Sequence, residues 1–196
     1  MSEIRQKPEA RARYRLKKTV VMVGMMGAGK TAVGRALAAR LGVPFLDSDA
    51  EIERAANMSV PEIFARDGEP FFREKEAQVI ARLLDEECGV LSTGGGAFLQ
   101  KRNRMAISER GVSVLLNADL DLLWSRVKHK DTRPLLRTSN PRATLSEIYA
   151  ARLPVYALAD VRVQSEADFS IEEMAERVLQ TLVRDRADVI EEVPHA

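Results

Sequence analysis

Short, mainly apolar runs recur along the chain, and each is followed by glycine or polar residues. Such runs, bounded by turn residues, are typical of buried strands. Five of them occupy residues 19–23, 43–46, 90–93, 112–116 and 161–163. Helical spacing of apolar residues fills most of the intervals, with long helices expected over about 70–87 and 119–128. Alternating strands and helices predict an α/β fold in which helices cover both faces of a parallel sheet.

Capping signals predict several of the helix ends. The S/T-x-x-E pattern of a capping box occurs at Ser59–Glu62, Thr144–Glu147 and Ser170–Glu173, and it predicts a helix start at each place. Gly42 is suited to end the helix that follows the first strand. Gly34 lies inside that helix, where glycine lowers stability unless another element packs closely against it.

A glycine-rich loop follows the first predicted strand. Residues 24–31 have the G-x-x-x-x-G-K-T spacing of a P-loop, between a strand and a helix as that motif requires. Glycines let successive N–H groups turn toward an anion, and the helix N-terminus adds its positive end. The lysine reaches the β- and γ-phosphates, and the hydroxyl that follows it ligates Mg²⁺. The residues expected to contact ATP are Gly27, Ala28, Gly29, Lys30, Thr31 and Ala32.

Two acidic residues follow the second predicted strand. Asp47 and Asp49 are separated by one residue, so their side chains share a face if the chain is extended there. One carboxylate could then serve Mg²⁺, while the other accepts a proton from an acceptor hydroxyl. The alternative is that one acid caps a helix and the other is solvated.

Arginines and glycines supply candidate groups for an anionic acceptor. Arg73 lies between aromatic and acidic residues, and Glu76 is placed to orient it by an ion pair. A fixed guanidinium is a natural receptor for a carboxylate, as Arg152 is too, although either could be a surface cation. Gly95 and Gly96 belong to a glycine triplet after the third strand, either a site of close backbone approach or a loose loop.

A polar stretch after residue 128 carries Arg133 and has no helical periodicity. A mobile lid there would exclude water and bring positive charge to the transferring phosphoryl group, although a surface loop is the alternative. Trp124 has the spacing of a core residue, and neither histidine has a partner at metal-ligand spacing.

Composition limits the possible classes. The 196 residues carry a net charge of +1, which indicates no general affinity for nucleic acid or membranes. The single Cys88 excludes an internal disulfide, and the sequence contains neither a secretory signal nor a long apolar span. We therefore expect a cytoplasmic, monomeric enzyme. Residues 1–18 are expected to form a basic tail, residues 19–184 a single domain and residues 185–196 a second tail.

These motifs together resemble the shikimate kinase family. The resemblance covers about residues 19–183 and rests on an ordered set of segments: the P-loop at 24–31, Asp47-Ser48-Asp49, Glu62–Phe64, Gly68–Glu76, Ser92–Gly96, Thr132–Leu136 and Arg152–Asp160. A P-loop alone is shared by many kinases, whereas the ordered set is specific.

The resemblance implies ATP-dependent phosphorylation of the 3-hydroxyl of shikimate, in the chorismate route to aromatic amino acids. It implies a nucleoside-monophosphate-kinase-like fold with sheet order 2-3-1-4-5, a substrate-binding subdomain near 48–78 and a lid near 128–140. Its site residues would be Asp49 as base, Arg73 and Arg152 on the carboxylate, and Gly95 and Gly96 against substrate. Lys30 and Arg133 would hold the transferring phosphate, with Arg126 on adenine and Thr31 and Asp47 on Mg²⁺.

Three other functions are compatible with the same motifs. A gluconate kinase also pairs a P-loop with a polyol carboxylate, and a nucleoside monophosphate kinase would need more arginines around its phosphate acceptor. From a different class, the chain could be a regulatory protein that binds nucleotide without catalysis, with its basic N-terminus on nucleic acid.

Overall fold

The computed structural model describes residues 13–86, 88–130 and 134–193. A five-stranded sheet forms its centre, in the order β3-β4-β2-β5-β6, and every neighbouring pair is parallel. The strands are β2 (Thr19–Val23), β3 (Phe45–Asp47), β4 (Val90–Ser92), β5 (Gly111–Asn117) and β6 (Val161–Gln164). Without the first short strand, this is the order 2-3-1-4-5, so the expected α/β P-loop fold is confirmed.

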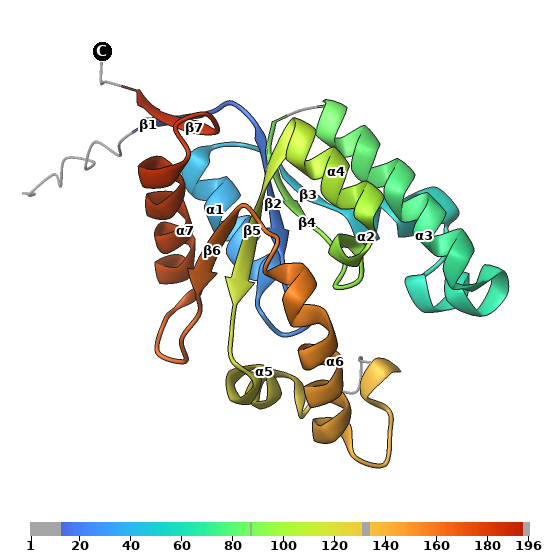
Figure 1. The fold of residues 1–196 in the computed structure, drawn as a ribbon. Helices are drawn as coiled ribbons and strands as arrows, with labels where there is room; N and C mark the ends of the chain where they lie inside the picture. The colour runs from blue at the N-terminus through green and yellow to red at the C-terminus, as the bar shows by residue number, and fades with distance from the viewer. Residues whose placement is uncertain (1–12, 87, 131–133, 194–196) are drawn as a thin grey trace, which may run out of the picture.

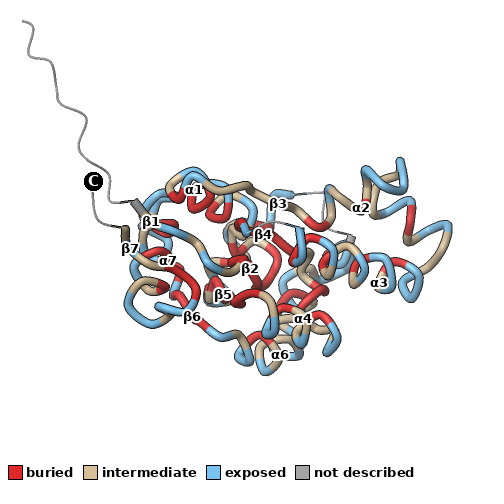
Figure 2. The backbone as a smooth tube through the Cα atoms, turned by 90° about the horizontal axis from the view of Figure 1, so that it is seen from above, coloured by how far each residue is buried: buried red, intermediate tan, exposed pale blue. Residues whose placement is uncertain are grey.

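Helices cover both faces of this sheet (Figure 1). α1 (Lys30–Leu41) packs against α7 (Ile171–Asp185) on one side, and α3 (Val60–Glu86) packs against α4 (Lys101–Arg110) on the other. The three central strands β2, β4 and β5 are almost fully buried, which Figure 2 shows as a red centre inside a paler rim. Nothing in the part of the chain that the structure describes has the length and apolar character of a membrane-spanning helix.

Close packing explains the glycine within α1. A Cβ on Gly34 would lie 3.0 Å from Cε2 of Phe45 and 3.4 Å from Cγ of Met22, so the helix approaches the sheet as expected. Gly42 ends the helix with a φ of 67° and donates its N–H to Ala38 and Ala39. The P-loop helix is therefore held firmly against the strands that precede and follow it.

α2 (Ser48–Ala56) and α3 form an arm at one edge of the sheet (Figure 1). Its own small core consists of Ile52, Ile63 and Phe72. The capping box at Ser59 is confirmed, because Ser59 N–H donates to Glu62 and Glu62 N–H donates to the Ser59 hydroxyl. An Asp-Gly pair is a turn signal, so the sequence at Asp67-Gly68 predicts a break in the helix, and at Gly68 φ is 82°, which breaks the helical path there.

Several helices differ from the sequence prediction. α6 (Pro141–Tyr156) begins three residues before Thr144, because the Asn140 side chain accepts the Ala143 N–H and Pro141 fits the first turn. α4 and the short η1 (Ala97–Leu99) before it were not predicted. The remaining elements are α5 (Leu120–Val127) and the short η2 (Pro134–Leu136).

The expected tails are wrong for the described part of the chain ends. β1 (Arg13–Leu16) pairs antiparallel with β7 (Ile190–Val193), from Arg13 opposite Val193 to Leu16 opposite Ile190. The sequence prediction missed this small sheet because charged residues in both strands mask the apolar pattern. In the structure, Val189 and Ile190 are buried, and Arg15 and Lys17 form ion pairs with Glu191. The segments β1 and β7, near the two chain ends, therefore pair beside α1 and α7.

Candidate active site

The P-loop has the backbone that anion binding requires. Gly24, Gly27 and Gly29 have φ angles of 139°, 81° and 94°, in the left-handed region that glycine adopts without strain. A Cβ on Gly24 would lie 2.9 Å from the Leu116 carbonyl oxygen, and one on Gly27 would lie 2.7 Å from Cγ1 of Val127. Both glycines are therefore required by close packing as well as by conformation.

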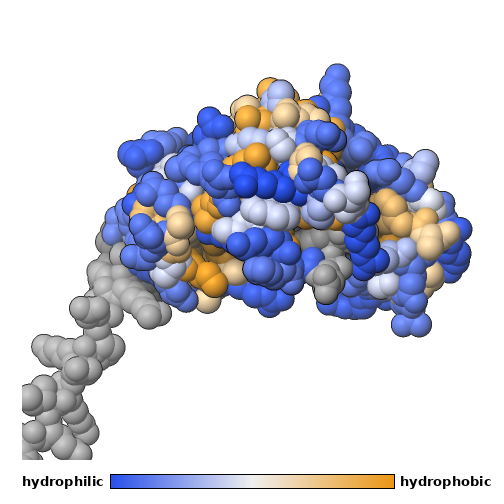
Figure 3. Space-filling view, turned by 90° about the horizontal axis from the view of Figure 1, so that it is seen from below, coloured by the Kyte–Doolittle hydropathy of each residue, from blue (hydrophilic) through white to orange (hydrophobic). Residues whose placement is uncertain are grey.

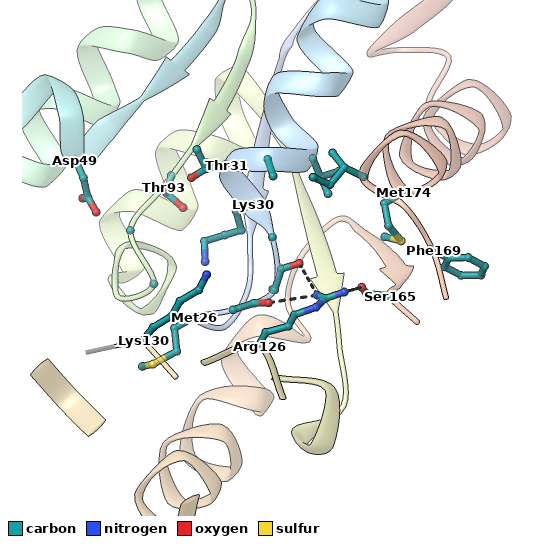
Figure 4. A pocket seen from close by; sticks show the side chains of 18 of the residues that line it. Met26, Lys30, Thr31, Asp49, Thr93, Arg126, Lys130, Ser165, Phe169 and Met174 are labelled. Atoms are coloured by element: carbon teal, nitrogen blue, oxygen red, sulfur yellow. Dashed lines mark hydrogen bonds between the residues drawn. The ribbon is translucent and has the colours of Figure 1, made fainter. Parts of the chain in front are cut away.

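Lys30 and Thr31 open onto a cavity of about 510 Å³ at the carboxyl ends of the strands (Figure 4). The Lys30 ammonium donates to the carbonyls of Gly24 and Met25, at 2.9 and 3.0 Å. The Thr31 hydroxyl lies 3.2 Å from the hydroxyl of Ser92 at the end of β4. The other predicted ATP contacts, Gly27, Ala28, Gly29 and Ala32, line the same cavity. Its volume suits a nucleotide.

Arg126 closes the far end of this cavity. Its guanidinium donates to the carbonyl of Gly27 at 3.2 Å and approaches the Ser165 hydroxyl at 3.5 Å, and Figure 4 shows it beside the loop. Phe169 and Met174 supply apolar surface nearby, and sequence reasoning did not identify either of them. A cation and apolar side chains around one end of a phosphate-binding cavity suit a nucleotide base.

The two acids do not share a face of an extended chain, so that expectation is wrong. Asp47 is the N-cap of α2, and its Oδ1 accepts the Ala50 N–H at 3.1 Å. Asp49 lies in the first turn of that helix and lines the cavity with Lys30. The capping alternative holds for Asp47, whereas Asp49 is largely buried rather than solvated.

Asp49 has the electrostatics of a proton acceptor. Burial is the main reason that its pKa rises from 3.8 to about 6; repulsion from Asp47 adds to this rise, and Lys30 opposes it. Its Oδ1 is buried without a hydrogen-bond partner among the described residues. Gly94 leaves room for that oxygen, since a Cβ there would lie only 2.9 Å from it. An unpartnered buried carboxylate oxygen is suited to accept a hydrogen bond from a ligand.

A second cavity of about 230 Å³ adjoins the first. Arg73, Arg152, Gly95 and Gly96 line it, so the structure brings together every predicted substrate residue that follows Asp49 in the chain. Leu135 from the short η2 lines it too, which brings the segment expected to be a lid to the edge of this cavity. Arg133 lies outside the described residues.

Arg73 is rigidly held. Its Nη1 lies 2.9 Å from Oε2 of Glu76, a fully buried residue, while Glu69 accepts from its Nε at 3.2 Å. Burial raises the pKa of Glu76, and the Arg73 charge opposes that rise. A Cβ on Gly96 would lie 2.4 Å from Nη2 of Arg73, so the glycine triplet is a site of close approach. The predicted ion pair between Arg73 and Glu76 is confirmed.

Lys130 is another cation that the sequence analysis overlooked. It lines the larger cavity, and Figure 4 shows its ammonium end directed toward Lys30. The polar stretch in which it lies was considered only for Arg133.

Figure 3 views the end of the molecule toward which the strands point, and its surface is largely hydrophilic with small apolar patches. Polar ligands fit this face.

The donor atoms here also suit a hard cation. Thr31 offers a hydroxyl oxygen in the larger cavity, with the Ser92 hydroxyl 3.2 Å behind it, and Asp49 offers an unpartnered carboxylate oxygen in the same cavity as Thr31. Mg²⁺ prefers oxygen ligands and usually keeps waters and substrate phosphates among them. The set fits such an ion without a dedicated cage of protein ligands.

Comparison with known proteins gives consistent matches. A family model described as shikimate kinase matches residues 26–183. The chain is 69% identical to the shikimate kinase of Ruegeria pomeroyi, over 90% of both chains. It is 67% identical to that of Cereibacter sphaeroides, over 90% of this chain and 88% of the relative.

Solved structures agree with these relatives. Shikimate kinase from Acinetobacter baumannii in complex with shikimate aligns with a TM-score of 0.81 at 37% identity, over 87% of this chain and 95% of that one. A gluconokinase from Sinorhizobium meliloti aligns with a TM-score of 0.56 at 20% identity, over 87% of this chain and 94% of that one. The second likeness shows a common fold alone.

Proposed function

This chain belongs to the shikimate kinase family, whose reaction is the ATP-dependent phosphorylation of shikimate, and from this premise we propose how its residues carry out that reaction. One observation carries the proposal. The larger and smaller cavities share four lining residues, Met26, Asp49, Gly94 and Gly95. A phosphoryl donor on the P-loop and an acceptor in the smaller cavity therefore meet beside the Asp49 carboxylate.

The smaller cavity binds shikimate through its carboxylate. Arg73 and Arg152 line this cavity, and a guanidinium pairs with a carboxylate through charge-assisted hydrogen bonds. Arg73 is already fixed by Glu76, so little side-chain entropy is lost when it binds the substrate. Gly95 and Gly96 let the ring approach the backbone. Holding the carboxylate at one end of the ring directs a hydroxyl at the other end toward Asp49.

Asp49 accepts the proton of the 3-hydroxyl as that oxygen attacks the γ-phosphorus. Its pKa of about 6 lies close to neutral pH, so the carboxylate is mainly ionised yet more basic than an ordinary aspartate. The bond from the γ-phosphorus to the bridging oxygen of ADP breaks as the new one forms. Lys30 and the P-loop N–H groups balance the negative charge on the phosphates.

The phosphates of ATP bind together with Mg²⁺ in this proposal. Thr31 would ligate the ion, Asp47 would contact it through water, and the ion would supply charge neutralisation on the β- and γ-phosphates. Arg126 would contact adenine, and Arg133 would bring a further positive charge as the segment near 128–140 closes. These roles are carried over from the family motif.

ADP release with purified protein and Mg·ATP tests the proposal when shikimate, gluconate and AMP are offered separately. We expect turnover with shikimate alone. Turnover with AMP would keep the P-loop assignment and refute the Arg73–Arg152 carboxylate site. Turnover with gluconate would keep both and refute shikimate as the acceptor. ATP binding without turnover on any acceptor would instead support the regulatory alternative.

A further inference from the structure

Tyr156 connects two parts of the shikimate cavity from behind. It is 1% exposed, it ends α6, and it is absent from the residues that line the cavity. Its phenol donates a hydrogen bond to the Gly95 carbonyl oxygen, and the Arg152 guanidinium lies beside that hydroxyl and interacts with it electrostatically. One hydroxyl therefore contacts both the glycine loop after β4 and the arginine one turn earlier on α6.

The chemistry of a phenol suits this double contact. A phenol has one proton to donate and lone pairs to accept with, whereas a guanidinium only donates and a carbonyl only accepts. Arg152 could donate to the Gly95 carbonyl directly, but among the described residues that carbonyl accepts from the phenol, and Arg152 lies beside them, so the hydroxyl is the link. The space is tight, since a Cβ on Gly95 would lie 3.5 Å from Nη1 of Arg152 and 4.0 Å from the phenol oxygen.

The two substrate arginines are supported differently. Arg73 has carboxylate partners in Glu76 and Glu69. For Arg152, the part of the chain that the structure describes provides a neutral phenol. A neutral partner fixes the direction of a guanidinium without neutralising its charge, so that charge stays available for an incoming carboxylate.

We propose that Tyr156 is a positioning residue that fixes Arg152 against the glycine loop, and so sets the angle at which Arg152 meets the substrate carboxylate. This inference rests on the proposed function, because it needs a carboxylate substrate in that cavity. Tyr156 acts through Arg152 and Gly95 and does not touch the reacting atoms.

The protonation state of the phenol agrees with this role. Burial raises the pKa of Tyr156 above its ordinary value of 10, although the Arg152 and Arg73 charges oppose the rise. The hydroxyl therefore keeps its proton throughout the working range of pH and donates it continuously to Gly95.

Tyr156→Phe in the full chain tests the inference, since it removes the hydroxyl and keeps the ring. We expect the KM for shikimate to rise about tenfold, with the KM for ATP unchanged and kcat lowered less than KM is raised. Tyr149→Phe is the matched control, because Tyr149 lies on the same helix, half-buried against the core and outside both cavities. Thermal unfolding of both variants verifies that they fold.

A cycle with Arg152→Ala separates positioning from a general structural role. If Tyr156 acts through Arg152, adding Tyr156→Phe to the Arg152→Ala variant leaves the KM for shikimate within about twofold. An equal rise in both backgrounds, or an unchanged KM in Tyr156→Phe alone, would overturn the inference while the proposed function stands. Absence of shikimate turnover by the unsubstituted chain would overturn both.

Discussion

Asp49 is basic because the fold keeps water from it, and that basicity has a thermodynamic cost. Its pKa in the folded protein is about 6, against 3.8 for an ordinary aspartate, mainly through burial. The folded state therefore binds the proton more tightly than the unfolded chain. Binding of this proton therefore stabilises the folded state. That contribution to the free energy of unfolding is complete below about pH 4 and is lost as the pH rises through 6.

Asp49→Asn should separate catalysis from stability. We expect shikimate turnover to fall at least about a hundredfold, because the amide cannot accept the proton, while ATP binding is retained. At pH 8 the free energy of unfolding should rise by about 2 kcal/mol, because the buried charge is gone. Steady-state kinetics and urea denaturation measure the two effects. Asp121→Asn, at an exposed aspartate of α5, is the control; unchanged turnover in Asp49→Asn would exclude Asp49 as the base.

The same carboxylate predicts a pH profile. As the pH falls below about 6, protonation of Asp49 removes the base, so kcat/KM for shikimate should decrease about tenfold per pH unit. Over this range the stability contribution of Asp49 changes in the opposite direction. A pH series of initial rates, with unfolding measured in parallel, tests this. An acid limb centred near pH 4 would contradict a buried base.

At the scale of elements, the sequence predicted the loops, helix breaks and helix caps that are determined by neighbouring residues. The P-loop, the break at Gly68 and the Ser59 and Ser170 capping boxes each depend on a few adjacent residues, and all are present. α4 was missed because its sequence is highly charged and it buries only Asn103 and Ile107, which gives almost no apolar periodicity.

Where the sequence prediction misplaced a helix start, a second local signal competed with the one that was used. The start of α6 was assigned to Thr144 because its pattern fits a capping box, but Asn140 followed by proline is an equally valid start and lies earlier. Asp47 does lie at the extended end of β3, but its side chain caps α2, so Asp49 lies in a helical turn and not on the same extended segment. The hydrogen bond from Tyr156 to Gly95 joins residues far apart in the chain, so no local pattern could have predicted it.

The glycine loop after β4 makes a further prediction at this scale. Gly96→Ala should displace the Arg73 guanidinium, because the new Cβ would lie 2.4 Å from Nη2. The KM for shikimate should rise at least about tenfold, and about 1–3 kcal/mol of stability should be lost, because the guanidinium must shift from its ion pair with the buried Glu76. Gly95→Ala is the comparison, since its Cβ makes ordinary contacts at 3.5 Å and beyond. Equal KM values in both variants would contradict this account of Gly96.

For the whole molecule, the β1–β7 sheet contributes stability rather than chemistry. Ile190 is 1% exposed and belongs to the main core, although it lies at the far end of the chain from the site. Ile190→Ala should cost about 2–4 kcal/mol of unfolding free energy and leave the kinetic constants unchanged. Chemical denaturation alongside kinetics measures this, with the exposed Glu192→Ala as control. A changed KM for shikimate would link the chain ends to the site.

The geometry of that small sheet also determines how the protein would respond to a pulling force. Arg13 lies opposite Val193, so both chain ends leave the antiparallel pair at the same point. Tension applied between the ends would unzip its hydrogen bonds one at a time, beginning at that pair. The load would then reach β2, at the centre of the parallel sheet, whose two ladders to β4 and β5 must shear together. Mechanical unfolding should therefore begin with a soft release at the chain ends, followed by a single stiff rupture of the catalytic core.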